Sequence, residues 1–322
     1  PMYHVWVLID LLDCLHWLQH EKKRLETAFN TTVDTRALQE TATRMLKTIA
    51  QFRHSSGQLP LFGDSSLPQT PDLDALLTYG QVVCKSKEPL SLGQSKALIH
   101  WPNSGFAAFR QSNPSASLIL DCGDLAPHAL PAHSHCDLGS FELHVGDEPV
   151  IVDSGVSEYQ ASLLRRYFRG AAAHNTVWVP GAEQAEIWES FRVAEYPDFK
   201  GCTVEQDTSG AKVTLAYENY NHRYQHQRSV YSVESRFWVV QDWLEYRHQD
   251  ENPCFSLLHI HPNQPLQFQD EVFTIGSKLM VMPFGYQGLE WSNDSPWRNN
   301  LNLYSEGFSL ARTGKIIALN PK

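Results

Sequence analysis

The chain has 322 residues, of which 42% are hydrophobic and 19% are charged, a balance that is ordinary for globular proteins. This length allows one large domain, or one domain and part of another, with a substantial buried core. The formal net charge of −10 argues against nonspecific binding of nucleic acid. No apolar run approaches the roughly 18 residues of a membrane-spanning helix, so we expect no membrane partner.

The first eighty or so residues have the apolar spacing of helices. Apolar side chains recur every three or four positions over residues 5–18, which predicts a first helix. A second helix is expected over residues 34–57 with Asp34 as its N-cap, and a third over residues 72–83. Prolines and a Gly-Asp-Ser-Ser stretch predict a loop over residues 59–71.

From about Leu98 the pattern changes to short strands separated by turn residues. The expected strands cover residues 106–110, 117–121, 141–145, 149–153, 174–179, 201–206, 212–217, 227–233, 236–243, 255–261, 278–283 and 315–319. Many short strands with few helices predict an antiparallel β-sandwich. The change of pattern places a domain boundary near residues 85–97, and we divide the chain into residues 1–90 and 91–322.

Three metal-compatible side chains lie among the expected strands: His135, Asp153 and His174, spaced 18 and 21 residues apart. Each lies at the end of an expected strand, and neighbouring strands of one sheet could bring such ends together. Two imidazoles and a carboxylate suit a divalent metal, zinc above all, with a fourth position left for water or a backbone oxygen. Each histidine by itself is more often a neutral packing residue. The three together, beside the arginine-rich run at residues 165–169, favour a metal site.

Between residues 133 and 189 the sequence carries a series of short motifs. They are His133-x-His135-x-Asp137, Ser140-Phe141-Glu142-Leu143, Val152-Asp153-Ser154-Gly155, Tyr167-Phe168-Arg169, Ala173-His174-Asn175-Thr176-Val177 and Glu183-Gln184-Ala185-Glu186-Ile187-Trp188. Together they resemble the C-terminal region of the heparinase II/III-like polysaccharide lyases. Pro1-Met2-Tyr3-His4 also resembles the family's Ser-Pro-x-Tyr-His element, which lies late in its helical domain.

The resemblance implies an α+β multidomain fold. The last helices of an incomplete α/α toroid would be followed by a large antiparallel β-sandwich, with the active site in the cleft between them. If only the end of the toroid is present, the helices should expose part of an apolar face, formed by Leu8, Leu12, Leu15, Met45, Leu46 and Ile49. We therefore expect the chain to self-associate or to need an upstream helical segment, and to show little activity alone.

The resemblance also implies the reaction, cleavage of an acidic polysaccharide next to a uronic acid by β-elimination. Such cleavage needs a neutralised uronate carboxylate, a base for the C5 proton and an acid for the departing C4 oxygen. The run at residues 165–169 is our candidate for a positive patch that receives an acidic polymer.

By motif, Tyr3 resembles the family's catalytic tyrosine, and His133 resembles the sandwich histidine that faces the substrate. Tyr159, Tyr167 and Arg169 match further residues of the cleft. The three metal-compatible side chains match the family's metal ligands. The family's Asn-His element, which would neutralise the substrate carboxylate, is not in this sequence.

Two other functions are compatible with the sequence. One is a noncatalytic sugar-binding sandwich with a structural metal, which is favoured if the helical half is absent. The other is a cupin-type metalloenzyme, because His-x-His on a β-sandwich occurs there as well. Cupins place a glutamate a few residues after the second histidine, whereas Gly139 and Ser140 stand four and five positions beyond His135 and Glu142 is too far.

The remaining signals concern compartment and a second histidine pair. Six cysteines without a C-x-x-C pair favour free thiols: Cys14, Cys84, Cys122, Cys136, Cys202 and Cys254. The polymer and the compartment stay open, with a lean to the periplasm or secretion because polysaccharides lie mostly outside the cytoplasm. His259 and His261 share one face of an expected strand and are interpreted as structural.

Overall fold

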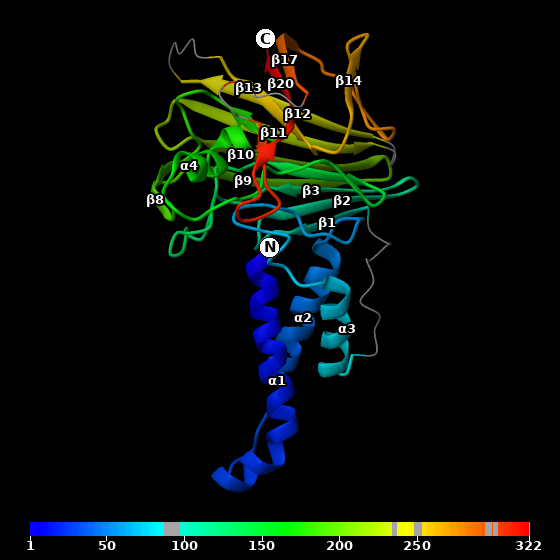
Figure 1. Ribbon diagram of the computed structural model, residues 1–322, viewed down its shortest axis with the longest axis vertical. Helices are drawn as coiled ribbons and strands as arrows, with labels where there is room; N and C mark the ends of the chain where they lie inside the picture. The colour runs from blue at the N-terminus through cyan, green and yellow to red at the C-terminus, as the bar shows by residue number, and fades with distance from the viewer. Residues whose placement is uncertain (87–96, 234–236, 248–252, 294–297, 299–301, 322) are drawn as a thin grey trace.

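The computed structural model describes residues 1–86, 97–233, 237–247, 253–293, 298 and 302–321 (Figure 1). Three helices, α1 (Met2–Phe29), α2 (Arg36–Phe52) and α3 (Leu73–Val83), form a stem below a body of β-sheets. None of the described helices is long and apolar enough to cross a bilayer. The boundary predicted near residues 85–97 falls mostly outside the described residues, and the division at residue 90 stays a prediction.

The helices begin close to where the sequence places them. The side chain of Asp72 caps α3 by accepting a hydrogen bond from Ala75 N at 2.7 Å. The prediction of Asp34 as the cap of α2 is wrong by one residue, because Thr35 is the N-cap. Asp34 instead accepts hydrogen bonds from the backbone and the guanidinium of Arg36.

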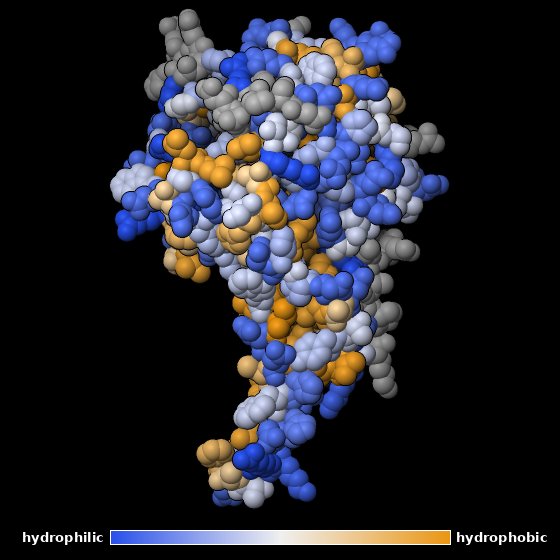
Figure 2. All heavy atoms as spheres, in the orientation of Figure 1, coloured by the Kyte–Doolittle hydropathy of each residue, from blue (hydrophilic) through white to orange (hydrophobic). Residues whose placement is uncertain are grey.

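The apolar face of the stem is covered, which corrects the prediction that it would be partly bare. Five of the six named residues are at most 1% exposed, namely Leu8, Leu12, Leu15, Leu46 and Ile49, while Met45 is partly buried. They belong to one apolar cluster, which also contains Ala108 and Ile119 on the face of the larger sheet that points toward the helices. Exposure instead falls elsewhere on α1, at Trp6, Val7 and Trp17, and Figure 2 shows apolar surface on the stem.

The larger sheet is antiparallel throughout. Its order is β1 (Leu98–Trp101), β2 (Phe106–Ser112), β3 (Ser115–Asp121), β4 (Phe141–Val145), β5 (Glu148–Ile151), β13 (Phe255–Ile260), β20 (Lys315–Pro321) and β17 (Tyr286–Ser292), with β6 (Val177–Trp178) beside β13. The apolar run Leu118-Ile119-Leu120 of β3 is buried on both faces because the sandwich core covers one face and the helices cover the other.

A second antiparallel sheet packs against the first. Its order is β12 (Phe237–Tyr246), β11 (Tyr224–Val233), β10 (Gly210–Glu218) and β9 (Asp198–Gln206). Leu118 and Leu143 of the larger sheet share one core cluster with Val213 and Val230 of this sheet. Buried and partly exposed residues alternate along β10, as expected for a strand with one face toward the core. The predicted β-sandwich is therefore confirmed.

Short elements complete the body. They are the sheet β14 (Leu266–Gln269), β15 (Val272–Ile275) and β16 (Leu279–Val281), the pairs β7 (Glu186–Trp188) with β8 (Arg192–Glu195) and β18 (Leu303–Tyr304) with β19 (Arg312–Thr313), helix α4 (Leu163–Arg169) and the 3₁₀ turn η1 (Ala171–Ala173). The arginine-rich run thus lies in a helix.

Glu142 of β4 joins the segment after α2 to the sandwich. Its Oε1 accepts hydrogen bonds from Leu61 N at 2.9 Å and Asp153 N at 3.0 Å. Its Oε2 lies 3.0 Å from His54 Nε2, and the His54 ring stacks on His144 at a centroid distance of 3.7 Å. Burial raises the pKa of Glu142 to about 8 and lowers the pKa of His54 to about 3. Near neutral pH, Glu142 is therefore protonated and donates to a neutral imidazole.

This pair predicts a defined pH dependence of stability. Between the ordinary pKa of 4.5 and about 8, only the folded protein keeps the Glu142 proton, so the contribution of Glu142 to the free energy of unfolding should fall as pH rises through this window. The lowered pKa of His54 acts in the opposite direction up to its ordinary pKa of 6.5. Glu142→Gln keeps an acceptor for the two backbone N–H groups and a donor for His54, and it should remove this part of the slope. Urea unfolding of both proteins from pH 5 to 8.5 measures the difference.

Glu142→Ala is the companion variant, because it leaves two buried N–H groups unpaired. We expect it to lose about 1–3 kcal/mol of stability for each. An unchanged pH slope in Glu142→Gln would contradict the assignment.

Candidate functional site

Tyr3 and His133 meet where the stem joins the sandwich. Tyr3 lies in the first turn of α1 and His133 in the loop before β4, and their ring centroids are 4.3 Å apart. The hydroxyl of Tyr3 shares a hydrogen bond of 2.7 Å with that of Tyr159, whose ring contacts Phe191 and Phe308. The side chain of His133 is 39% exposed. The motif residues from the two parts of the chain therefore form one aromatic cluster that solvent can reach.

A carboxylate that the sequence did not single out holds this cluster. Asp64 lies in the loop between α2 and α3, with Oδ2 at 2.8 Å from His133 Nδ1 and Oδ1 at 2.8 Å from His135 Nε2. The guanidinium of Arg165 donates to both carboxylate oxygens. Burial opposes ionisation, but these three donors keep the pKa of Asp64 well below its usual range. Nothing in the sequence marks it, because aspartate in a Gly-Asp-Ser-Ser stretch is typical of a turn.

The arginine-rich run does not form the exposed positive patch that the sequence suggested. Arg165 and Arg169 are fully buried, and only Arg166 of the three arginines is exposed. Asp64 neutralises Arg165, whose guanidinium also donates to the carbonyl of Ser190. Substrate charge would have to be met by other groups.

Two further predicted residues, Tyr167 and Arg169, donate hydrogen bonds to backbone carbonyls. The guanidinium of Arg169 donates to the carbonyl oxygens of Ser134 and Glu189, at 3.1 and 3.2 Å. The hydroxyl of Tyr167 donates to the carbonyl of Leu303 at 3.2 Å, and burial raises the pKa of this phenol. In the described part of the chain, neither residue shares a hydrogen bond or ring contact with the Tyr3 cluster.

The three predicted metal ligands lie in loops rather than at strand ends. His135 is in the loop before β4, Asp153 lies two residues beyond β5, and His174 follows η1. The strand predicted over residues 174–179 is shorter, and β6 begins only at Val177. All three side chains are nevertheless fully buried and adjacent, with the rings of His135 and His174 at a centroid distance of 5.3 Å.

The hydrogen bonds of this group leave two nitrogens free. Asp153 Oδ2 lies 2.7 Å from His174 Nδ1, while Oδ1 accepts from Gly155 N at 3.0 Å. His135 Nδ1 and His174 Nε2 are buried without a hydrogen-bond partner among the described residues. Unpaired buried nitrogens of this kind are costly, and they fit metal ligation. Asp153 is placed to orient His174, because its carboxylate already occupies the other ring nitrogen.

Other side chains can be compared with this group. Among the described residues, two sets of three bring potential ligand atoms within 4.8 Å of one another: His54, Glu142 and His144, and His100, Cys122 and Cys202. The predicted set is not one of them, so it would have to contract around an ion. His259, interpreted as structural, also has an unpaired buried Nε2, and its Nδ1 lies 3.4 Å from the Ser154 hydroxyl.

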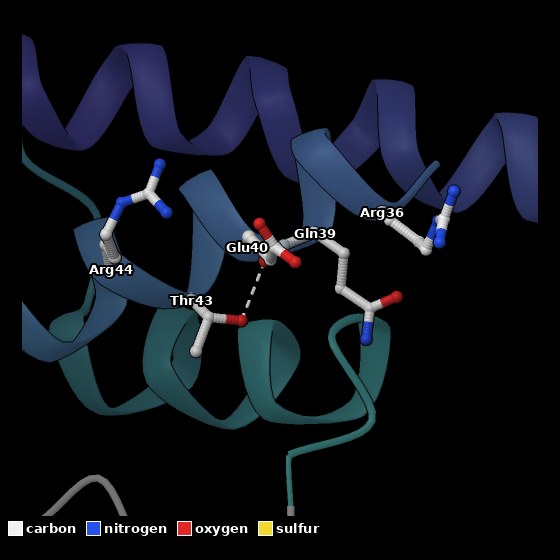
Figure 3. Close-up of a pocket in the computed structure, with 5 residues that line it drawn as sticks. All are labelled: Arg36, Gln39, Glu40, Thr43 and Arg44. Atoms are coloured by element: carbon white, nitrogen blue, oxygen red, sulfur yellow. Dashed lines mark hydrogen bonds between the residues drawn. The ribbon is translucent and has the colours of Figure 1, made fainter. Parts of the chain in front are cut away.

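A hollow on α2 lies apart from these groups. Figure 3 shows its lining, which comes from one helix: Arg36, Gln39, Glu40, Thr43 and Arg44. The hydroxyl of Thr43 donates to the carbonyl of Gln39 at 2.7 Å, which is a local contact of the helix. None of the candidate site residues lines it.

Comparison with known proteins now decides the family. The pattern of the family "Heparinase II/III-like, C-terminal" matches residues 93–309, more than half of the chain. The chain belongs to this family. The predicted resemblance is thereby confirmed. A sequence comparison with curated proteins finds no match.

Solved heparinases share the fold of this family member. A heparinase III gene product has a TM-score of 0.74 and 18% identity, covering 100% of this chain and 49% of that protein. A second structure named heparinase III gives 0.70 and 17%, covering 99% and 51%. A heparan sulfate lyase, HepC from Pedobacter heparinus, gives 0.66 and 16%, covering 100% and 49%. The chain thus spans about half the length of these proteins, and the likeness concerns the fold.

The Asp64 network predicts a large cost for removing one charge. Asp64→Asn keeps the shape of the side chain but leaves the buried guanidinium of Arg165 without its counter-charge. We expect a loss of about 3–5 kcal/mol in the free energy of unfolding, measured by urea denaturation near neutral pH. The matched control is Asp34→Asn, which breaks an exposed ion pair with Arg36 and should leave the midpoint nearly unchanged. Equal midpoints for the two variants would refute this role of Asp64.

Proposed function

We propose that this chain supplies the sandwich and the last helices of a polysaccharide lyase that cleaves a uronic-acid-containing glycan by β-elimination. The observation that carries the proposal is the meeting of Tyr3 with His133 in a solvent-accessible cluster between helices and sandwich. Both are the residue types that elimination requires, and each lies in a motif of the family. The solved relatives named heparinase III and heparan sulfate lyase favour an acidic, heparan-like substrate.

Tyr3 is suited to move the protons of the reaction. Burial raises its pKa, while its hydrogen bond with Tyr159 acts in the opposite direction. The phenol is thus protonated at neutral pH and can give its proton to the C4 oxygen as the C4–O bond breaks. If it first takes the C5 proton as a phenolate, the Tyr159 hydroxyl can donate to that phenolate and stabilise it.

His133 is suited to hold the substrate carboxylate. Its Nδ1 faces the ionised Asp64, so the Nδ1–H is donated there and the ring is fixed. The exposed edge, with Nε2, is left for the substrate and can donate a hydrogen bond to a carboxylate when protonated. Arg165 is committed to Asp64, so further neutralising groups must come from outside this cluster.

We also propose a site for a divalent metal, zinc above all, with His135 and His174 as ligands. Asp153 would be the third ligand or would orient His174 through their hydrogen bond. Two unpaired buried nitrogens and an adjacent carboxylate support it. A bound cation would supply positive charge that holds the loops before β4 and after η1 together. Because His135 shares Asp64 with His133, the site would also fix the substrate-facing histidine.

The lyase proposal predicts the effect of removing one hydroxyl. Tyr3→Phe should lower turnover about 10²–10⁴-fold with little effect on folding, because only proton transfer is lost. The readout is the ultraviolet absorbance of the unsaturated uronate, for this chain and for the chain extended upstream of Pro1 by its own reading frame. Tyr79→Phe, which breaks the tyrosine's exposed hydrogen bond to Asp13, is the matched control and should keep full turnover.

Two outcomes of this assay would reject the lyase proposal. Release of reducing ends without the absorbance would mean hydrolysis. Binding of heparan-like and other uronate polymers without any cleavage, by both forms of the chain, would favour a noncatalytic sugar-binding sandwich.

The metal proposal predicts close to one equivalent of a divalent ion, zinc above all, bound by the imidazole site. Elemental analysis of the wild type and of His174→Ala gives the metal held by this site as a difference, so that metal held by thiolates does not contribute. His174→Ala should abolish this binding, and Asp153→Ala should weaken it about 10–100-fold because His174 loses its orienting partner. His222→Ala, at an exposed histidine, should leave it unchanged. A metal-free wild type whose melting temperature matches that of Asp153→Ala would exclude the site.

A further inference from the structure

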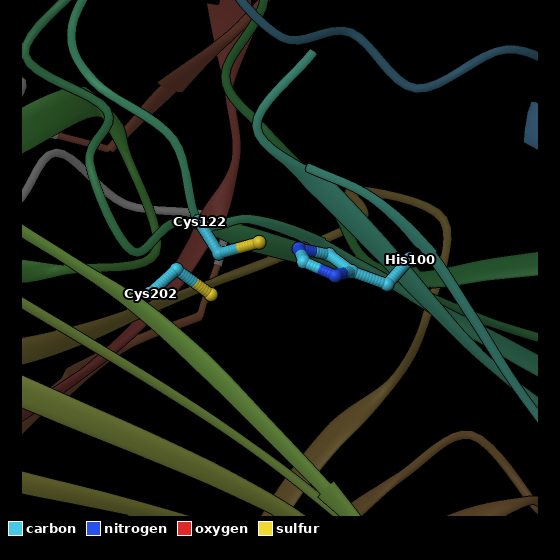
Figure 4. Close-up of side chains that lie close together, drawn as sticks. All are labelled: His100, Cys122 and Cys202. Carbon is cyan, nitrogen blue, oxygen red and sulfur yellow. The ribbon is translucent and has the colours of Figure 1, made fainter. Parts of the chain in front are cut away.

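Three side chains of types that bind metals meet on the sandwich, apart from the Tyr3 cluster and from the proposed metal site at His135, Asp153 and His174. His100 comes from β1, Cys122 directly follows β3, and Cys202 comes from β9 (Figure 4). One ring nitrogen and the two sulfur atoms all lie within 4.8 Å of one another. Figure 4 shows both thiols pointing toward the imidazole.

The fold brings these residues together at a defined place. β1 is the edge strand of the larger sheet and β9 is the edge strand of the smaller one. His100 lies on the same face of β1 as Leu98, which belongs to the sandwich core. Cys122 is buried in that core and Cys202 packs against it. The cluster therefore sits where the two sheet edges face each other.

A β-bulge lies beside Cys202 and changes the direction in which the neighbouring side chains of β9 point. The register of β9 with β10 shifts between Ala216 and Tyr217, so that Lys200 has no partner in the ladder. Gly201 follows with a φ of +113°, a conformation that a residue with a side chain rarely adopts. Bulges of this kind re-aim neighbouring side chains at sheet edges.

We propose that His100, Cys122 and Cys202 bind one Zn²⁺ ion, with water in the fourth position. Two thiolates and one imidazole are a favoured ligand set for zinc. Around tetrahedral zinc, such atoms lie about 3.5–3.8 Å apart, so small side-chain rotations would close the present cluster. On binding, each thiol releases its proton to solvent and forms a metal–sulfur bond, and no electrons are transferred.

The ligand atoms are available for this. Among the residues that the structure describes, the His100 ring has no hydrogen-bond partner. Cys202 Sγ contacts the carbonyl of Thr203 at 3.9 Å and the thiol of Cys122, which belongs to the same cluster. Burial lowers the pKa of His100, so the imidazole is in its neutral, ligating form.

A disulfide between the two cysteines is the competing outcome. It would use both sulfur atoms but would leave the convergence of His100 unexplained. A zinc ion uses all three groups and would tie β1 to β9 across the sandwich. Binding should therefore stabilise the folded chain in proportion to its affinity.

The test uses Co²⁺ as a spectroscopic substitute for Zn²⁺ in the full, reduced chain. Thiolate ligation gives a near-ultraviolet sulfur-to-cobalt band that the imidazole–carboxylate site cannot produce. We expect the band to saturate at one equivalent and to disappear on addition of Zn²⁺. Cys202→Ser should abolish it and His100→Ala should weaken cobalt binding at least tenfold. Cys14→Ser, at an exposed thiol, should leave the band unchanged.

The two informative variants lie at partly exposed positions, so the result does not depend on replacing the buried Cys122. Zinc should also raise the melting temperature of the wild type more than that of Cys202→Ser. The proposal is overturned if the reduced wild type shows no sulfur-to-cobalt band, or if the band persists in Cys202→Ser. Peptide mapping of the unreduced protein that finds a Cys122–Cys202 disulfide would overturn it as well.

Discussion

The buried carboxylate of Asp64 is the interaction on which the candidate site depends. It accepts hydrogen bonds from His133 and His135 and forms the ion pair of Arg165, so that one side chain joins the loop after α2, the loop before β4 and helix α4. A guanidinium that is fully buried needs a counter-charge, because an unpaired buried charge is strongly destabilising. The same bonds leave Nε2 of His133 and Nδ1 of His135 directed away from the carboxylate, where we propose that substrate and metal bind.

A second buried acid at the same junction has the opposite protonation state, and the neighbours explain why. Asp64 faces a guanidinium and two imidazole donors, and the pKa of its carboxyl lies below the usual range. Glu142 contacts two backbone N–H groups and the rings of His54 and His144, and it is close to Asp153. No cation among the described residues offsets its burial, so its pKa rises to about 8. Both acids tie the segment between α2 and α3 to the sandwich. Charged and neutral polar contacts therefore both help to attach the stem, together with the apolar contacts of Ala108 and Ile119.

The exposed apolar side chains of α1 mark a surface on which a further helical segment could pack. The face toward α2, α3 and the sheet is closed, whereas Trp6, Val7 and Trp17 remain exposed on α1. The chain spans about half the length of the solved heparinases. We propose that an upstream helical segment or a second copy covers these side chains. Trp6 also contacts the ring of Tyr3, so such a segment would reach the edge of the proposed catalytic cluster.

The sequence by itself determined the local elements and the residues that carry motifs. Periodicity placed α2, α3 and most long strands, because each buries one face at its own repeat, and the motifs marked Tyr3 and His133. Only the tertiary structure brought in Asp64 and set His100 beside Cys122 and Cys202, since these contacts join segments far apart in the chain. The tertiary structure also covered the apolar face of the stem and buried Arg165 and Arg169 of α4. A repeat of apolar residues indicates that one face of an element is buried. It does not indicate which segment covers that face, or which charge balances a buried guanidinium. Both depend on how segments that are distant in the chain pack together.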